Sequence, residues 1–244
     1  MGRIVGIGIG PGDPELITIK ASKTLREADI IFVPKTHQKK PSIALNVIKP
    51  VLEKRDRPPE ILELILPMTR NKKELEIAWE KNAEIMVEKA KCEKLIAYVT
   101  LGDPTLYSTF TYLSRKIREK YPEINIEIIP GITSLTACAA RSGVSLVEGN
   151  EILSIVPSDS DLEKIREIVK YSDNLVFMKR IQHLESILPI LEKAGFTKNS
   201  RVIIARRCTM PNEKMKIEKL INIKSWRAYE DYFSLAIVKR RGER

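Results

Sequence analysis

Two short loops carry the residue types in this sequence that could hold a small molecule. Residues 10–14 read GPGDP and residues 101–104 read LGDP, and each loop follows a short apolar run. Glycine permits positive φ and a close approach of the backbone to a ligand. Asp13 and Asp103 can accept hydrogen bonds from an amine or a ribose hydroxyl, or can cap a helix whose first turn holds the proline. The loops therefore predict a ligand site or, as the plainer alternative, two helix-starting turns.

The common nucleotide motifs do not fit the first loop. The dinucleotide pattern G-x-G-x-x-G fails in both registers, because Pro11 or Asp13 stands where its last glycine is required. No Gly-Lys-Ser/Thr follows the glycines, so a triphosphate-binding loop is also disfavoured.

The cysteines and histidines do not form a metal-binding or disulfide pattern. Cys92, Cys138 and Cys208 are odd in number and far apart in the sequence. His37 and His183 are the only histidines and have no metal-ligand spacing around them. We expect no metal site, and we expect the cysteines to be small buried hydrophobic residues.

The net charge of +10 over 244 residues favours an anionic partner. Nucleic acid is one candidate, but Lys and Glu are mostly interspersed and aromatic residues make up 6%, too few for a base-stacking platform. A polycarboxylate small molecule fits the charge equally well, a basic surface without a specific partner is the plainer alternative, and we expect no nucleic-acid partner. No apolar run approaches the roughly 20 residues that span a bilayer. The N-terminus enters a strand without a signal-peptide pattern. We therefore expect a cytoplasmic protein without a membrane partner.

Alternating apolar and amphipathic segments predict an α/β fold in the first half of the chain. Strands are expected at 4–9, 29–33, 61–66 and 94–100, and helices directly after the first loop and at 42–52, 71–91 and 105–120. Pro34 is expected to end the second strand, and Asp103 to cap the last of these helices. In a mainly parallel sheet both Gly-Asp-Pro loops would lie at the carboxyl edge, where ligands bind.

The second half of the chain predicts a different sheet. A strand at 124–129 and a small-residue helix after residues 130–134 are followed by strands at 152–156 and 174–178 and helices at 162–169 and 184–194. Strands at 201–205, 216–221 and 229–238 then follow one another without a helix, which favours a mixed sheet with antiparallel pairs. We expect two α/β domains, residues 1–120 and 124–244.

Five stretches, in this order, resemble the tetrapyrrole methylase family. They are GIGIGPGDPELITIKA at 6–21, LGDPTLYSTF at 101–110, PGITSLTACAARSG at 130–143, VFMK at 176–179 and DYFSLAIV at 231–238. The resemblance implies two α/β domains with a cleft between them, a homodimer, and S-adenosylmethionine as the methyl donor, leaving as S-adenosylhomocysteine.

Within the family, the blocks at 101–113, 129–141, 206–214 and 232–238 are most similar to members that methylate carbon 20 of precorrin-2 or its cobalt complex in cobalamin (vitamin B12) biosynthesis. The Lys, Glu and Ile-rich composition favours the cobalt form. Methylation at another corrin position, diphthamide-type protein methylation and a basic RNA-binding module stand as alternatives.

The resemblance also implies site residues. Cofactor contacts are expected at Ile9, Pro11, Gly102, Asp103, Leu106, Thr133, Ser134, Met178, Cys208 and Phe233, with Met210 close by. Most of these would act through backbone groups and shape, and Asp103 would supply the main polar contact.

The substrate side is expected to use positive charge. The family's substrate carries acetate and propionate groups, and the candidates to bind these carboxylates are Lys35, Lys39, Lys40 and Arg141. Tyr107 could line the same side. The sequence assigns no catalytic residue. Asp103, Glu148, water or a substrate carboxylate could remove the proton from the methylated carbon.

Overall fold

A computed structural model describes residues 2–36, 41–91, 94–179, 184–222 and 231–240. The chain divides into two compact units, Met1–Thr133 and Ser134–Arg244, each with its own five-stranded sheet. The sheets differ in strand direction, so each unit is described by itself.

Unit 1 contains a parallel sheet in the order β3-β2-β4-β1-β5. Its strands are β1 (Arg3–Gly8), β2 (Ile30–Lys35), β3 (Glu60–Ile65), β4 (Leu95–Thr100) and β5 (Asn125–Ile129). Its helices are the 3-10 turn η1 (Pro14–Leu16), α1 (Ile19–Glu27), α2 (Ile43–Leu52), α3 (Lys72–Ala90) and α4 (Phe110–Lys120).

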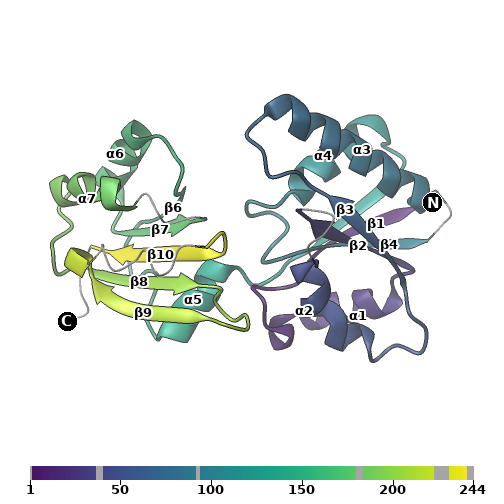
Figure 1. Cartoon of the computed structure of the whole chain (residues 1–244), viewed down its shortest axis with the longest axis horizontal. Coiled ribbons are helices and arrows are strands. Elements are labelled where there is room, and N and C mark those ends of the chain that lie inside the picture. The colour runs from purple at the N-terminus through teal and green to yellow at the C-terminus, as the bar shows by residue number, and fades with distance from the viewer. Residues whose placement is uncertain (1, 37–40, 92–93, 180–183, 223–230, 241–244) are drawn as a thin grey trace. The chain divides into compact units, whose positions relative to one another are not determined.

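Helices cover both faces of this sheet, with α1 and α2 on one side and α3 and α4 on the other (Figure 1). Alternate residues of β1 belong to different cores: Val5 and Ile7 pack with α1 and α2, whereas Ile4 packs with α3 and α4. Strands buried on both faces explain the unbroken apolar runs in the sequence. The predicted mainly parallel N-terminal sheet is confirmed.

Unit 2 contains a mixed sheet in the order β6-β7-β10-β8-β9. Its elements are α5 (Ser134–Ser142), β6 (Leu153–Pro157), α6 (Leu162–Tyr171), β7 (Asn174–Met178), α7 (Leu184–Lys193), β8 (Arg201–Arg206), β9 (Lys214–Lys219) and β10 (Ser234–Lys239). Among the strands that the structure describes here, β6 and β7 form the one parallel pair, and β10 pairs antiparallel with β7 and β8. The predicted mixed C-terminal sheet is confirmed.

The hydrophobic core of unit 2 lies between its sheet and the helices α6 and α7 (Figure 1). Phe177, Ile204 and Ala236 contribute to it from three adjacent strands and are essentially inaccessible to solvent. Helix α5 packs near β8 and β9. Its small residues Ala137, Cys138 and Ala139 are buried, as close packing requires.

The division between the units differs from the predicted boundary near residues 121–123. Strand β5 pairs with β1, from Arg3 opposite Asn125 to Ile7 opposite Ile129, so it completes the first sheet. The chain leaves unit 1 only after Thr133. Sequence periodicity detects a strand at this position but carries no information about its pairing partner.

The prediction that Pro34 ends its strand is wrong. Strand β2 continues through Pro34 to Lys35, paired with β3 along its full length. Its ladder with β4 covers only Ile30–Phe32. Proline lacks an N–H donor, and it is tolerated here because this part of the strand has a partner on one side only.

The two Gly-Asp-Pro aspartates do not begin long helices. Asp13 caps η1, while α1 begins at Ile19 and is capped by Thr18, whose hydroxyl accepts from Ala21 N at 3.2 Å. Helix α4 begins at Phe110, because Tyr107 has a left-handed backbone with φ 50° that interrupts a helix from residue 105.

Candidate active site

Three loops meet at the carboxyl edge of the unit 1 sheet. The loop after β1 and the loop after β4 form an isolated bridge, in which Gly102 N donates to Gly10 O at 2.7 Å. Both glycines have positive φ, 77° at Gly10 and 68° at Gly102, a conformation that favours glycine. The two Gly-Asp-Pro loops are therefore one bonded structure.

The third loop, after β5, packs backbone to backbone against the other two. A Cβ atom at Gly131 would lie 2.2 Å from the carbonyl oxygen of Gly102, and a Cβ at Gly8 would lie 2.6 Å from the nitrogen of Gly131. These contacts leave no room for any side chain. Glycine is required at both positions by close approach, and this packing presents backbone groups of three loops at one edge.

Asp103 ties the second loop to the third. Its Oδ1 accepts from Thr105 N at 2.8 Å and from Thr105 Oγ1 at 2.5 Å, and its Oδ2 accepts from Gly131 N at 2.9 Å. Partial burial raises the pKa of Asp103, but the hydrogen bonds from Thr105 and Gly131 outweigh burial and hold the pKa below its usual value. The carboxylate therefore stays ionised and fixes the loop geometry.

The other predicted cofactor residues of unit 1 lie around these loops. Ile9 is fully buried in the core and donates its N–H to Thr100 O at 3.0 Å, and Pro11 is also buried. Leu106 and Thr133 are half-buried. The structure thus brings Ile9, Pro11, Gly102, Asp103 and Leu106 into one group of loops at the carboxyl edge.

In unit 2, three segments converge at one edge of the sheet. Because β10 is antiparallel to β7 and β8, its start lies beside the ends of both strands. Lys179 N donates to Ser234 O at 3.1 Å, and Arg207 N donates to Phe233 O at 2.8 Å. The predicted contacts Met178, Cys208 and Phe233 therefore lie at the same edge, which single-strand patterns could not show.

The loop after β8 is strained and firmly held. Arg207, Thr209 and Asn212 all have positive φ, between 52° and 68°, which is uncommon for residues with a Cβ. Glu213 accepts hydrogen bonds from Arg141 at 3.1 Å and from the backbone N–H of Thr209. Such strain persists only where the surroundings fix it, and it concentrates at functional sites.

The second anchor of this edge is Asp231. Its Oδ2 accepts from Arg207 Nε at 2.9 Å and from Arg206 Nε at 3.2 Å, while its Oδ1 accepts from Phe233 N at 3.0 Å. Partial burial raises the pKa of Asp231, but the backbone bond from Phe233 and the Arg207 guanidinium outweigh it and lower the pKa. Asp231 thus fixes the segment that carries Phe233.

Cys208 lies against Cys138 of α5, and both are buried. The hydrogen bond between the thiols, followed by burial, raises the pKa of Cys138, while the same hydrogen bond lowers the pKa of Cys208. The prediction of small buried cysteines is confirmed for these two, and Cys92 lies outside the described residues.

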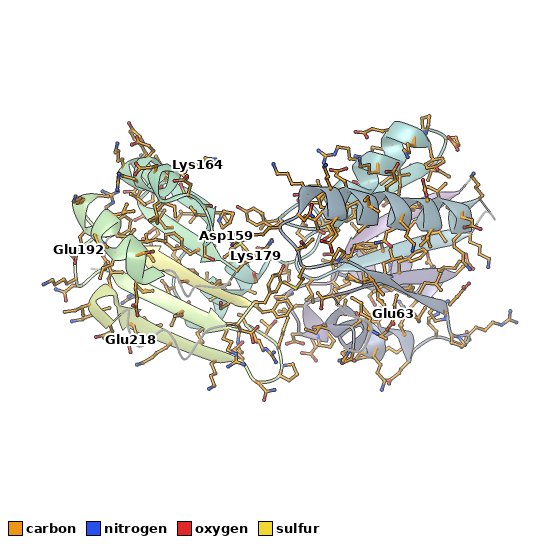
Figure 2. All side chains as sticks on the ribbon, turned by 45° about the horizontal axis from the view of Figure 1, so that its top comes forward. Glu63, Asp159, Lys164, Lys179, Glu192 and Glu218 are labelled. Atoms are coloured by element: carbon orange, nitrogen blue, oxygen red, sulfur yellow. The ribbon has the colours of Figure 1, made fainter. Side chains whose placement is uncertain are left out.

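Lys179 is a feature of this edge that sequence reasoning missed. It follows Met178 with φ 63°. Burial lowers the pKa of Lys179, and the charge of nearby Asp159 opposes the shift. Figure 2 shows Asp159 and Lys179 close together in unit 2. Lysine after a short apolar strand looks like an ordinary surface residue in the sequence, so no local signal could reveal it.

The predicted substrate residues are less uniform. Lys35 pairs with Glu63 at 2.8 Å and Arg141 with Glu213 at 3.1 Å, so both positive charges already have acidic partners. Tyr107 is 43% exposed beside Asp103 and its loop. Lys39 and Lys40, like His37 and His183, lie outside the described residues.

Two candidate bases are placed differently by the structure. The Asp103 carboxylate accepts the hydrogen bonds from Thr105 and Gly131 described above. Glu148 precedes β6, whereas Met178 ends the parallel strand β7, so Glu148 lies toward the opposite end of that sheet from Met178. Glu148 therefore does not join the edge that holds Met178, Cys208 and Phe233.

The described ranges contain neither a metal-ligand cluster nor a membrane-spanning helix. No three His, Cys, Asp or Glu side chains among those residues are grouped as metal ligands would be. None of the helices seen there combines the length and apolar character needed to cross a membrane.

Comparison with known proteins gives consistent results. Residues 3–223 match the family described as Tetrapyrrole (Corrin/Porphyrin) Methylases. The chain is 36% identical over 238 residues to the probable cobalt-precorrin-2 C(20)-methyltransferase of Methanocaldococcus jannaschii, covering 98% of this chain and 96% of that protein. It is 29% identical to the cobalt-precorrin-2 C(20)-methyltransferase of Salmonella typhimurium, covering 87% and 86% of the two chains.

Solved structures share the fold. The cobalt precorrin-4 methyltransferase CbiF matches with a TM-score of 0.74 at 19% identity, over 97% of this chain and 94% of that one. The uroporphyrin-III C-methyl transferase from Thermus thermophilus, complexed with S-adenosylhomocysteine, matches with a TM-score of 0.70 at 20% identity, over 98% and 97%. On sequence and fold together, this chain belongs to the tetrapyrrole methylase family.

Proposed function

We propose that this protein transfers the methyl group of S-adenosylmethionine to carbon 20 of cobalt-precorrin-2, or of metal-free precorrin-2, in cobalamin biosynthesis. The observation that carries the proposal is the 36% identity, over nearly the whole of both chains, to the Methanocaldococcus jannaschii relative named for this reaction. The Salmonella typhimurium relative is also named for the cobalt form, which favours the cobalt-bearing substrate.

The cofactor contacts proposed in unit 1 rest on the packed loops. Ile9, Pro11, Gly102, Asp103 and Leu106 are contributed by the two bonded Gly-Asp-Pro loops, and Thr133 and Ser134 follow the third loop. Their contribution would come from backbone groups held in place by Asp103. In unit 2, the proposed contacts are Met178, Cys208 and Phe233, held by Glu213 and Asp231.

The chemistry asks mainly for alignment. The donor, when bound, supplies an electrophilic methyl group on its sulfonium. The nucleophilic carbon 20 attacks that methyl, the carbon–sulfur bond breaks, and the proton on carbon 20 leaves to water or a substrate carboxylate. The role of the chain is to orient the reactants, which can contribute up to roughly 7–11 kcal/mol in favourable cases. The loops of unit 1 that Asp103 fixes, and the segments of unit 2 that Glu213 and Asp231 fix, suit that role.

The test is turnover with both forms of the substrate. The protein is incubated with labelled S-adenosylmethionine and either cobalt-loaded or metal-free precorrin-2, and transfer is followed by mass spectrometry. Transfer to at least one form is expected, faster with the cobalt form. Transfer only to another tetrapyrrole would contradict the proposal. Such a result would favour the reaction of a relative such as the Methanocaldococcus jannaschii uroporphyrinogen-III C-methyltransferase, 29% identical over 88% of this chain.

The cofactor site has its own test at Pro11. Pro11→Leu should weaken S-adenosylhomocysteine binding, measured by calorimetry, more than it lowers the free energy of unfolding. Equal losses would assign Pro11 a structural role alone. We also propose that the protein is a homodimer, as the family resemblance implies, and light scattering at several concentrations tests this.

A further inference from the structure

A cavity of about 440 Å³ lies on unit 1 beside the second Gly-Asp-Pro loop. Pro104 and Thr105 of that loop line it, together with Ile128 of the edge strand β5 and one side of α4. The cavity therefore adjoins the loop that Asp103 fixes, without including the proposed cofactor contacts themselves.

The cations of α4 fall into two groups. Lys116 pairs with Glu76 at 2.6 Å, and Lys120 pairs with Glu80, both across to α3. Arg115 and Arg118 instead line the cavity. They are three residues apart, so they lie on the same side of the helix.

The two arginines of the cavity have no acidic partner among the residues that the structure describes. Neither guanidinium forms a hydrogen bond or an ion pair with another side chain within the part of the chain that the structure describes. Glu119 also lines the cavity, which leaves a net positive charge there. Unpaired arginines around a hollow favour an anionic ligand, because guanidinium binds carboxylate through two parallel hydrogen bonds.

Neighbouring groups hold Arg115 in place and accept the hydrogen bonds of the Thr111 and Ser114 hydroxyls. The Arg115 guanidinium lies 5.6 Å from the ring centre of Tyr112, which stacks on Trp79 with ring centres 4.0 Å apart. Thr111 Oγ1 donates to Pro104 O at 3.1 Å, and Ser114 Oγ donates to Thr111 O at 3.1 Å. The guanidiniums are therefore the donors left to meet an anion in this cavity.

We propose that this cavity binds a carboxylate group of the tetrapyrrole substrate through Arg115 and Arg118. The inference rests on the proposed function, which supplies a substrate rich in acetate and propionate groups. It also replaces the expectation placed on Lys35 and Arg141, whose charges already pair with Glu63 and Glu213. Arg115 and Arg118 thus act as substrate-binding residues rather than as a stabilising charge at the end of α4.

The test compares two double variants on the same helix. Arg115→Gln/Arg118→Gln removes the charges at the cavity, and Lys116→Gln/Lys120→Gln removes the same net charge from the side facing α3. Uroporphyrin III, a stable tetrapyrrole octacarboxylate, is titrated into each protein and followed by its Soret absorbance at several salt concentrations. S-adenosylhomocysteine affinity and thermal unfolding are measured in parallel.

The arginine variant should bind uroporphyrin about tenfold more weakly, with a shallower dependence on salt, because two charge pairs are lost. Its affinity for S-adenosylhomocysteine should not change, and the lysine variant should bind uroporphyrin nearly as the parent protein does. Equal weakening in both variants, or none in the arginine variant, would overturn the inference while leaving the proposed function in place. Absence of uroporphyrin binding by the parent protein would overturn the proposed substrate class and this inference together.

Discussion

Replacing Asp103 with asparagine tests whether this residue organises the site loops. The carboxylate accepts two hydrogen bonds from Thr105 and one from Gly131 N. An asparagine can turn its oxygen toward only one of these partners, and its NH2 group would then face another donor. A hydrogen bond to a charged group contributes about 1.5–3 kcal/mol, and partial exposure places this site near the lower end, so we expect a loss of about 2 kcal/mol.

Asp13 provides the matched control, because it occupies the same place in the first Gly-Asp-Pro loop. Its Oδ1 accepts from Glu15 N at 2.9 Å and caps the short turn η1. Asparagine caps helices as well as aspartate does, so Asp13→Asn should cost about 0.5 kcal/mol or less. Urea unfolding reports both losses, followed by the fluorescence of Trp79 in a Trp226→Phe background.

The effect of Asp103→Asn should also depend on pH. The pKa of Asp103 lies below its ordinary value of 3.8, so its ionised form stabilises the fold above that value and loses this contribution as pH falls through the lowered pKa. The difference between the parent and Asp103→Asn should therefore be largest near pH 7 and shrink at the lowest pH where both stay folded. Equal costs for the two asparagine variants, or a difference independent of pH, would refute this role.

Three further substitutions follow from the same geometry. Gly131→Ala should lower the free energy of unfolding by about 3 kcal/mol, because its Cβ would meet the Gly102 carbonyl. Gly149→Ala, with φ 54° and open space around it, should lower it by only about 1 kcal/mol. Thermal unfolding measures both losses, and similar losses would contradict the packing argument. Lys179→Met should stabilise the protein by up to about 1 kcal/mol near pH 7, because the lowered pKa of Lys179 means that its charged form is unfavourable in the fold. The gain should vanish as pH rises past 10.5. A loss of stability near pH 7 would disprove this prediction. Glu213→Gln should weaken S-adenosylhomocysteine binding up to about tenfold, because it loosens the strained loop after β8. The free energy of unfolding should fall by only about 1 kcal/mol. An unchanged affinity, measured by calorimetry, would remove that loop from the cofactor site.

Local sequence patterns predicted the kind of fold well because burial dictates residue type. Strands such as β1 and β4 are buried on both faces and read as unbroken apolar runs. The sequence pattern also showed no helix between the last three predicted strands, which indicated the antiparallel pairing that the structure has. The errors arose where pairing or backbone strain decides the outcome. The partner of β5, the course of β2 through Pro34 and the late start of α4 after Tyr107 depend on contacts that no local pattern contains.

The sequence predicted the candidate site about as completely as it predicted the fold. Gly102 and Asp103 stood out by type, yet the capping role expected of Asp103 is replaced by bonds to Thr105 and Gly131. Lys179, Arg115 and Arg118 were missed because basic residues are common in this sequence. Only their burial, or the cavity beside them, distinguishes them from the ordinary charged surface.

The position of the transferred methyl group tests the proposed function most directly. The protein is incubated with S-adenosylmethionine carrying a 13C-labelled methyl group and with cobalt-precorrin-2, and the product is analysed by carbon NMR. We predict a single labelled methyl on carbon 20, with S-adenosylhomocysteine formed in equal amount. A labelled methyl on any other carbon, or S-adenosylhomocysteine formed without a methylated tetrapyrrole, would contradict the proposed function.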